Sequence, residues 1–202
     1  AKLVEETRNV NDISGLNNLI NVKYKYADYE SKESTRDKIR YLELVRDQSK
    51  SLTTEATRAK TEAEIDALLT KYADASQTAV DSAFERRAYI VNQTNNVLRK
   101  AETARTIPEI TQVKRENPLA SQKAKDLLNA RRTQILTDTR NLSNILLSGE
   151  YQALKDGLKD YPLATKDVRD RVNAKISVFE NDNAILQKQR NNEELNNIAE
   201  SG

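Results

Sequence analysis

A repeat with a period of about 45 residues constrains the fold of this chain more than any other feature of its sequence. One register aligns four sets of residues: Ile20, Ile65, Ile110 and Leu154; Ser31, Ser76, Ser121 and Thr165; Val45, Ile90, Ile135 and Phe179; Leu52, Val97, Leu142 and Leu186. Within each set the steps are 45, 45 and 44 residues. We therefore predict four copies of one unit, at residues 1–60, 61–105, 106–149 and 150–202.

Each of the two middle copies carries the start signals of a short helix. Thr61 precedes Glu64 by three residues, and Thr106 precedes Glu109 by the same distance. This spacing is the capping-box pattern, in which the hydroxyl and the carboxylate each accept a hydrogen bond from a free amide at the helix N-terminus. Pro108 falls in the first turn of the second helix, where its missing N–H is not needed. The two helices are thus predicted to begin at equivalent positions.

A longer helix follows in each copy. Its N-cap candidates are Ser76, Ser121 and Thr165, whose hydroxyls suit that position. Apolar residues then recur seven apart, at Leu128, Ile135 and Leu142 in one copy and at Val172, Phe179 and Leu186 in the next. This spacing is typical of helices packed side by side with a slight left-handed twist, so we predict that these residues form the core.

The predicted fold is all-α: an elongated array of four helical units, each either a helical hairpin or a three-helix bundle. Two polar stretches, Asn92–Asn96 and Thr137–Asn141, place poor helix formers midway along long helices. A break at these stretches would give three short helices per unit, whereas continuity would give one long helix. We expect residues 1–15 and the Asn-rich tail from about Asn191 to be frayed ends.

The composition removes whole classes of chemistry. The chain has no His, Cys, Met or Trp, so it cannot form a Ser-His or Cys-His nucleophile pair or a Cys/His zinc site. Its four glycines are scattered, which excludes a Gly-rich phosphate loop. We predict no catalytic, cofactor-binding or metal-ligating residue, and an enzyme ranks last among the functions considered.

Charge and hydropathy limit the partners. The 33 basic and 31 acidic residues are mixed along the chain and leave a net charge of +2, so there is no concentrated positive field to attract nucleic acid. No stretch approaches the roughly 20 apolar residues of a membrane span, so no membrane insertion is expected within these residues. A protein partner is the remaining expectation.

One segment suggests a relationship. The stretch Ala59–Leu68 resembles the sequence leading into the last helix of albumin-binding GA modules and of FIVAR-type repeats, and Asn117–Ser121 is similar to the turn between their helical units. Those families are three-helix bundles strung along cell-wall-attached proteins of Gram-positive bacteria. The resemblance implies the same extracellular setting. The chain departs from the GA pattern around Asn92–Asn96, where those modules contact albumin, so albumin binding does not carry over.

Two groups of residues are candidate partner-binding sites. Arg86-Arg87 and Arg131-Arg132 recur at one phase of the repeat and could form a ridge that binds a partner through guanidinium groups. Their alternative role is pairing with nearby acids, with their stems packed over the core. Tyr24 and Tyr29 belong to a tyrosine cluster near one end and could anchor an interface, or close the end of the first bundle.

These features favour a non-enzymatic segment of a bacterial surface protein. It would act as a helical stalk or adhesin that binds a host serum or matrix protein, because repeated units extend reach and present similar surfaces many times. The alternative is a cytoplasmic helical scaffold or a component of secretion machinery, which would share the same composition and fold. An export signal would separate the two settings.

Overall fold

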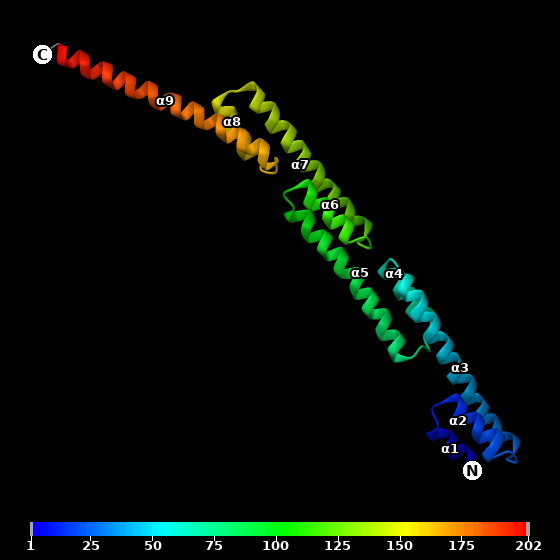
Figure 1. Ribbon diagram of the computed structural model, residues 1–202. Helices are drawn as coiled ribbons and strands as arrows, with labels where there is room; N and C mark the ends of the chain where they lie inside the picture. Colours follow the sequence, from blue (N-terminus) through cyan, green and yellow to red (C-terminus); the bar gives the residue numbers. More distant parts are fainter. Residues whose placement is uncertain (1, 201–202) are drawn as a thin grey trace. The chain divides into compact units, whose positions relative to one another are not determined.

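The computed structural model describes residues 2–200, and their side chains through residue 193. Within these residues every regular element is helical, which confirms the predicted all-α class (Figure 1). The elements are α1 (Lys2–Asn9), α2 (Ile13–Asn18), a π-helical turn η1 (Leu19–Lys23), α3 (Tyr29–Arg58), α4 (Glu62–Lys71), α5 (Gln77–Thr103), α6 (Ile107–Glu116), α7 (Gln122–Ser148), α8 (Tyr151–Asp160) and α9 (Lys166–Glu200). From α3 onward, long helices alternate with helices of 10 residues.

The chain divides into two compact units, Ala1–Gln93 and Thr94–Gly202. The first unit contains α1 to α4 and the first part of α5, and the second contains the rest of α5 and α6 to α9. Each unit is built from two three-helix bundles. We number these bundles 1 to 4 along the chain.

Bundles 1 and 2 form the first unit and share α3. In bundle 1, α1 and α2 pack against the first half of α3, and Leu3, Leu16 and Ile39 are buried between them. In bundle 2, the second half of α3 packs against α4, with Leu52 and Ile65 fully buried. One long helix therefore completes one bundle and begins the next.

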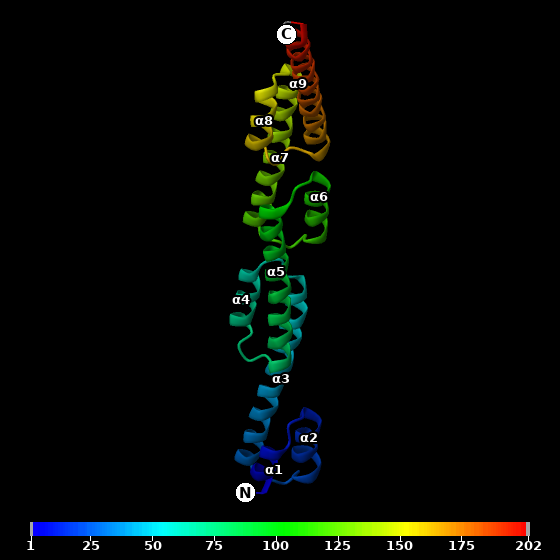
Figure 2. The ribbon, with the colours of Figure 1, turned by 90° about the vertical axis from the view of Figure 1, so that its left-hand side faces the viewer.

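Bundles 3 and 4 form the second unit and share α7. The first half of α7 joins α6 and the end of α5 around Leu128, and the second half joins α8 and α9 around Leu142. Figure 2 shows α8 and the start of α9 lying along α7. Gly157 permits the close approach of α8, because a Cβ there would lie 2.9 Å from the Ile145 Cδ1 atom.

The helix lengths explain this sharing. A helix of 10 residues is about 15 Å long, whereas one of 27 residues is about 40 Å long, so the short helix covers only half of its long neighbour. The other half must be covered by the next short helix. The packing unit is therefore a three-helix bundle made from two half-helices and one short helix, one of the two alternatives that the sequence left open.

The capping boxes form as predicted. The Thr61 hydroxyl accepts a hydrogen bond from the Glu64 N–H at 3.2 Å, and the Glu64 carboxylate reaches back to the Lys60 N–H at 2.7 Å. Thr106 and Glu109 make the same two bonds at the start of α6. The carboxylate bonds the amide of the residue before the N-cap, so it fixes the chain as it enters the helix.

The polar stretches in the middle of the long helices do not break them: α5 and α7 run straight through Asn92–Asn96 and Thr137–Asn141. Side chains of these stretches, and of the equivalent part of α3, bind the turn that precedes the next long helix. The hydroxyls of Ser49, Thr94 and Thr139 accept hydrogen bonds from the N–H groups of Ser76, Ser121 and Thr165, at 2.7, 3.0 and 3.0 Å. We call this contact the turn clasp.

In each of α3 and α7, the residue just before the turn-clasp hydroxyl is a second acceptor for the same turn. The Gln48 side chain accepts a hydrogen bond from the Asp74 N–H at 2.9 Å, and the Asp138 carboxylate accepts one from the Leu163 N–H at 3.0 Å. Gln93, the corresponding residue of α5, is buried. Polar residues that disfavour a helix locally thus serve as hydrogen-bond acceptors for backbone N–H groups that lie 25 to 27 residues away.

The N-terminal segment is not a frayed end. Residues 2–9 form α1, in which Leu3 is only 2% exposed, and the buried Thr7 and Thr35 hydroxyls are 2.8 Å apart. In bundle 1, α1 takes the position that the second half of α3 takes in bundle 2. It therefore completes the core of bundle 1. The expected fraying of residues 1–15 was therefore wrong for the part that the structure describes.

The register of the first repeat also differs from the prediction. Asp28, not Ser31, caps α3, and its carboxylate accepts a hydrogen bond from the Ser31 N–H at 2.7 Å. Leu16, not Ile20, fills the place of Ile65, since each lies four residues after its N-cap. The short helix of this repeat has one residue more than α4 between its caps, and η1 absorbs that residue as a π-helical turn.

At the other end, α9 continues beyond its partners. Phe179 is half-buried, with its ring edge-on to Tyr151 at 5.9 Å, but Leu186 is 53% exposed although the sequence placed it in the core. No helix of the described part covers it. The tail from Asn191 belongs to α9, and its side chains after residue 193 lie outside the description.

Candidate binding surface

The repeated arginines Arg86 and Arg131 hold helix ends. The Arg86 guanidinium donates to the Ala59 carbonyl at 2.9 and 3.2 Å, and the Arg131 Nε donates to the Ala104 carbonyl at 2.8 Å. These carbonyls close the C-terminal ends of α3 and α5, where backbone acceptors lack partners and the helix dipole favours a cation. Both side chains are thus engaged inside the fold, with carbonyl groups in place of the acids that the sequence suggested.

Lysines take the same role in the outer bundles. Lys38 donates to the Thr7 carbonyl at 2.8 Å, and Lys175 donates to the Leu146 carbonyl at 3.0 Å. Each of the four bundles therefore has one cationic side chain that donates to a carbonyl at the C-terminal end of a helix. This side chain comes from the first half of the long helix that follows in the same bundle. This recurrence accounts for the arginine spacing without a partner.

The second arginine of each pair behaves differently in the two copies. Arg87 forms ion pairs with Glu62 at 3.3 Å and with Asp66 at 3.0 Å, both near the start of α4. Arg132 is exposed and makes no hydrogen bond or ion pair with any residue that the structure describes. Of the four predicted arginines, Arg132 is therefore the one whose guanidinium remains available.

We expect Arg131→Ala to lower the free energy of unfolding by about 1–2 kcal/mol, because it leaves the Ala104 carbonyl without its donor. Arg132→Ala is the matched control, since it removes an exposed arginine next to it, and its effect should stay within about 0.5 kcal/mol. Urea unfolding followed by circular dichroism measures both. Equal effects would show that the carbonyl contact does not stabilise the helix end.

Tyr24 closes the end of bundle 1. Its hydroxyl donates to the Glu6 carboxylate at 2.8 Å, and Lys23 donates to the other carboxylate oxygen at 2.6 Å. Bundle 2 repeats the arrangement, with the Tyr72 hydroxyl 2.5 Å from the Glu55 carboxylate and Lys71 beside it. Tyr24 thus has the structural role that the sequence left as an alternative.

Tyr29 lies in the open. It is 75% exposed, and its neighbour Tyr26 is 94% exposed. Val22, which is 69% exposed, precedes them, so three large apolar side chains lie bare around the turn from η1 to α3. We call Val22, Tyr26 and Tyr29 the tyrosine patch. The sequence left both roles open for Tyr24 and Tyr29, and the structure places Tyr24 at the end of bundle 1 and Tyr29 on the surface.

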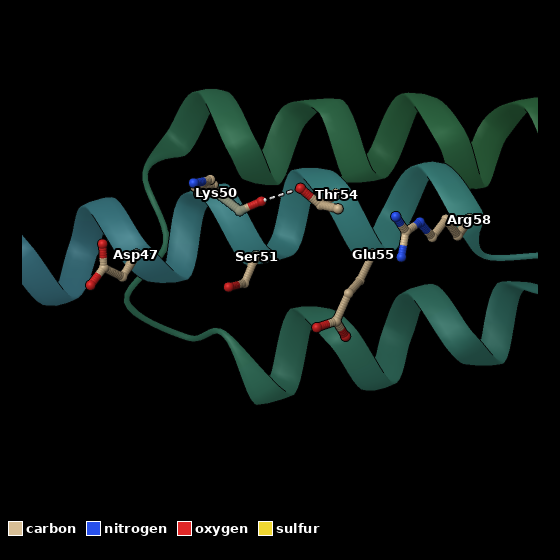
Figure 3. A pocket seen from close by; sticks show the side chains of 6 residues that line it. All are labelled: Asp47, Lys50, Ser51, Thr54, Glu55 and Arg58. Carbon is tan, nitrogen blue, oxygen red and sulfur yellow. Dashed lines mark hydrogen bonds between the residues drawn. The ribbon is translucent and has the colours of Figure 1, made fainter.

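The surface hollows of bundle 2 are shallow. One is lined by a single face of α3: Asp47, Lys50, Ser51, Thr54, Glu55 and Arg58 (Figure 3). Thr54 donates to the Lys50 carbonyl at 2.8 Å, and in Figure 3 Glu55 points toward α4. Tyr72 and Lys71 lower the pKa of Glu55, which makes its carboxylate a weak proton acceptor near neutral pH. The hollow is thus lined by polar and charged side chains of one helix.

Within the described residues, no three His, Cys, Asp or Glu side chains gather as metal ligands would. The helices of that same part include none with the length and apolar character needed to cross a membrane. No protein-family model matches the chain, and no curated protein or solved structure matches it significantly. The residues themselves are thus the basis for any functional assignment.

Acid should weaken this fold. Lys100 and the Arg105 backbone N–H lower the pKa of Glu109 by donating hydrogen bonds to its carboxylate. Similar bonds lower the pKa values of Glu6, Glu33, Glu55 and Glu180. A folded pKa below the unfolded value gives stability that is present above the unfolded pKa and is lost as the pH falls through the folded one.

We therefore expect the melting temperature to fall as the pH drops below about 5, and Glu109→Gln to reduce that dependence. Thermal melts followed by circular dichroism across this range measure it. Glu102→Gln removes an exposed carboxylate from the end of α5 and serves as the control. A pH dependence equal in the parent and the Glu109 variant would contradict the assignment.

Proposed function

We propose that this chain is a non-enzymatic stalk segment of a Gram-positive bacterial surface protein. The observation that carries the proposal is the sharing of α3 and α7 between neighbouring bundles. A shared helix joins two bundles without a flexible linker, so each added repeat extends the molecule instead of forming a separate domain. The resemblance of Ala59–Leu68 to helical repeats of surface proteins supports the setting.

The stalk also binds a protein partner, a host serum or matrix protein, through the tyrosine patch. Tyrosine is enriched among residues that dominate protein interfaces, because it buries a large apolar ring and keeps a polar hydroxyl. Tyr26 and Tyr29 are the most exposed tyrosines that the structure describes, and Lys25 and Arg36 lie 5.8 and 6.0 Å from their rings. A patch of aromatic rings edged by cations suits a partner surface with apolar and acidic groups.

The test is capture of proteins from serum and from matrix extracts by immobilised residues 1–202. We expect Tyr26→Ala with Tyr29→Ala to reduce the captured partner by at least about tenfold, as expected when interface anchors are truncated. Arg132→Glu probes the exposed arginine, and Lys123→Glu makes the same charge change at an exposed position of α7. Parent-like melting curves would show that each variant is folded.

Three results would contradict all or part of the proposal. Capture that is unchanged in the tyrosine variant would place the binding surface elsewhere. Absence of any captured partner, together with turnover of a small-molecule substrate, would overturn the non-enzymatic assignment. Absence of both activities would remove the adhesin role and leave the stalk alone.

A further inference from the structure

The second half of α9 repeats the part of α7 that receives bundle 4. Asp138, Thr139 and Leu142 of α7 correspond, 44 residues later, to Asp182, Asn183 and Leu186 of α9. The same positions are held by Gln48, Ser49 and Leu52 in α3 and by Gln93, Thr94 and Val97 in α5. Each long helix thus carries two polar acceptors followed by one apolar residue.

In the first three long helices these positions are occupied by a following repeat. The second polar residue takes the N–H of the N-cap of the next long helix, in all three cases at 3.0 Å or less. The apolar residue is fully covered: Leu52, Val97 and Leu142 are 0, 1 and 0% exposed. In all three helices, these positions therefore contact the following repeat, which consists of a short helix, a turn and the start of a long helix.

In α9 the same set is bare. Leu186 is 53% exposed and its neighbour Ile185 is 55% exposed. Asp182 and Asn183 are exposed and have no hydrogen-bond partner among the described residues. Beyond Leu186 the correspondence ends, because Arg190 stands where α7 has Leu146. Every residue from Glu180 to Glu193 is exposed, so the sequence correspondence is what singles out Asp182, Asn183 and Leu186. Together with the adjacent Ile185, we call these residues the α9 face.

We propose that the α9 face is a docking surface for one further repeat of the same kind, which follows residue 193 in the same polypeptide. A second copy of the chain is a poorer occupant, because α2 with η1, α4, α6 and α8 are each already packed in their own bundles and have no short helix to offer. The proposal does not depend on the proposed stalk or adhesin function.

An extended protein tests the proposal. A second copy of residues 150–193 is joined directly after residue 193, which keeps the 44-residue step between α7 and α9. Amide hydrogen exchange of residues 181–193 is then compared with that of the 202-residue chain. We expect their exchange to slow by at least about tenfold, because docking would cover a helical segment whose residues 181–193 are all exposed.

Variants make the test specific. Asp182→Ala with Leu186→Ala should abolish the slowing, whereas Lys188→Ala, at an exposed position outside the α9 face, should preserve it. A second extension with residues 106–149 in place of 150–193 guards against an added copy that does not fold. The proposal is wrong if neither extension slows exchange, or if the unextended chain forms a dimer that Leu186→Ala dissociates.

Discussion

Leu142→Ala is expected to lower the free energy of unfolding by about 2–5 kcal/mol, whereas Leu186→Ala should change it by less than about 0.5 kcal/mol. The two leucines occupy equivalent positions of α7 and α9, but Leu142 is 0% exposed and Leu186 is 53% exposed. Truncation of Leu142 opens a cavity among Leu154, Val172 and their neighbours. Truncation of Leu186 removes only side-chain surface that is already in water.

Urea unfolding followed by circular dichroism measures both variants. Hydrogen exchange of residues in bundle 4 adds a local reading, because a chain with several cores need not unfold in one step. A large loss in Leu186→Ala would mean that this residue is covered in solution by another part of a molecule. A small loss in Leu142→Ala would contradict the described core of bundle 4.

Asp138→Ala is expected to lower the free energy of unfolding by about 2–3 kcal/mol. The Asp138 side chain is 2% exposed and accepts hydrogen bonds from the Leu163 N–H at 3.0 Å and from Gln134 at 2.6 Å. Its removal leaves a buried N–H group unpaired, in the turn that directs the chain into α9. Asp138→Asn keeps a carbonyl acceptor and should lose less.

The matched control is Asp182→Ala, which removes the equivalent carboxylate of α9, where the structure gives it no partner among the described residues. Its melting curve should overlay that of the parent. Thermal and urea unfolding of the three variants give the order of effects. If Asp138→Ala and Asp182→Ala had equal effects, the hydrogen bond between Asp138 and the Leu163 N–H would contribute nothing to stability.

Local signals predicted the helices well. The capping boxes at Thr61 and Thr106 depend on residues three apart, and the core positions Leu128, Ile135 and Leu142 depend on residues seven apart, so a single sequence reveals both. The first repeat was harder. Asp28 and Ser31 are both residue types that suit an N-cap, so the sequence alone does not choose between them. No local sequence pattern indicates the extra residue of the short helix, which the structure accommodates as a π-helical turn.

Longer-range contacts could not be predicted in this way. The polar residues of Thr137–Asn141 indicated a possible break because they are poor helix formers. Their role as acceptors could not be predicted, because the N–H groups that they bind lie about 25 residues away. The arginine pairs recur with the repeat whether they bind a partner or hold helix ends, so recurrence alone did not separate the two roles. The roles of Tyr24 and Tyr29 differ because only Tyr29 is largely exposed, and exposure depends on the folded structure, which the sequence does not give directly.

The sharing of α7 has a mechanical consequence. The first half of this helix belongs to the core around Leu128 and the second half to the core around Leu142. When a pulling force detaches α8 and α9, the end of α7 loses its packing, and its helical hydrogen bonds alone stabilise a short helix poorly in water. Rupture of bundle 4 should therefore weaken bundle 3, and single-molecule extension should show coupled steps where independent domains would give separate ones.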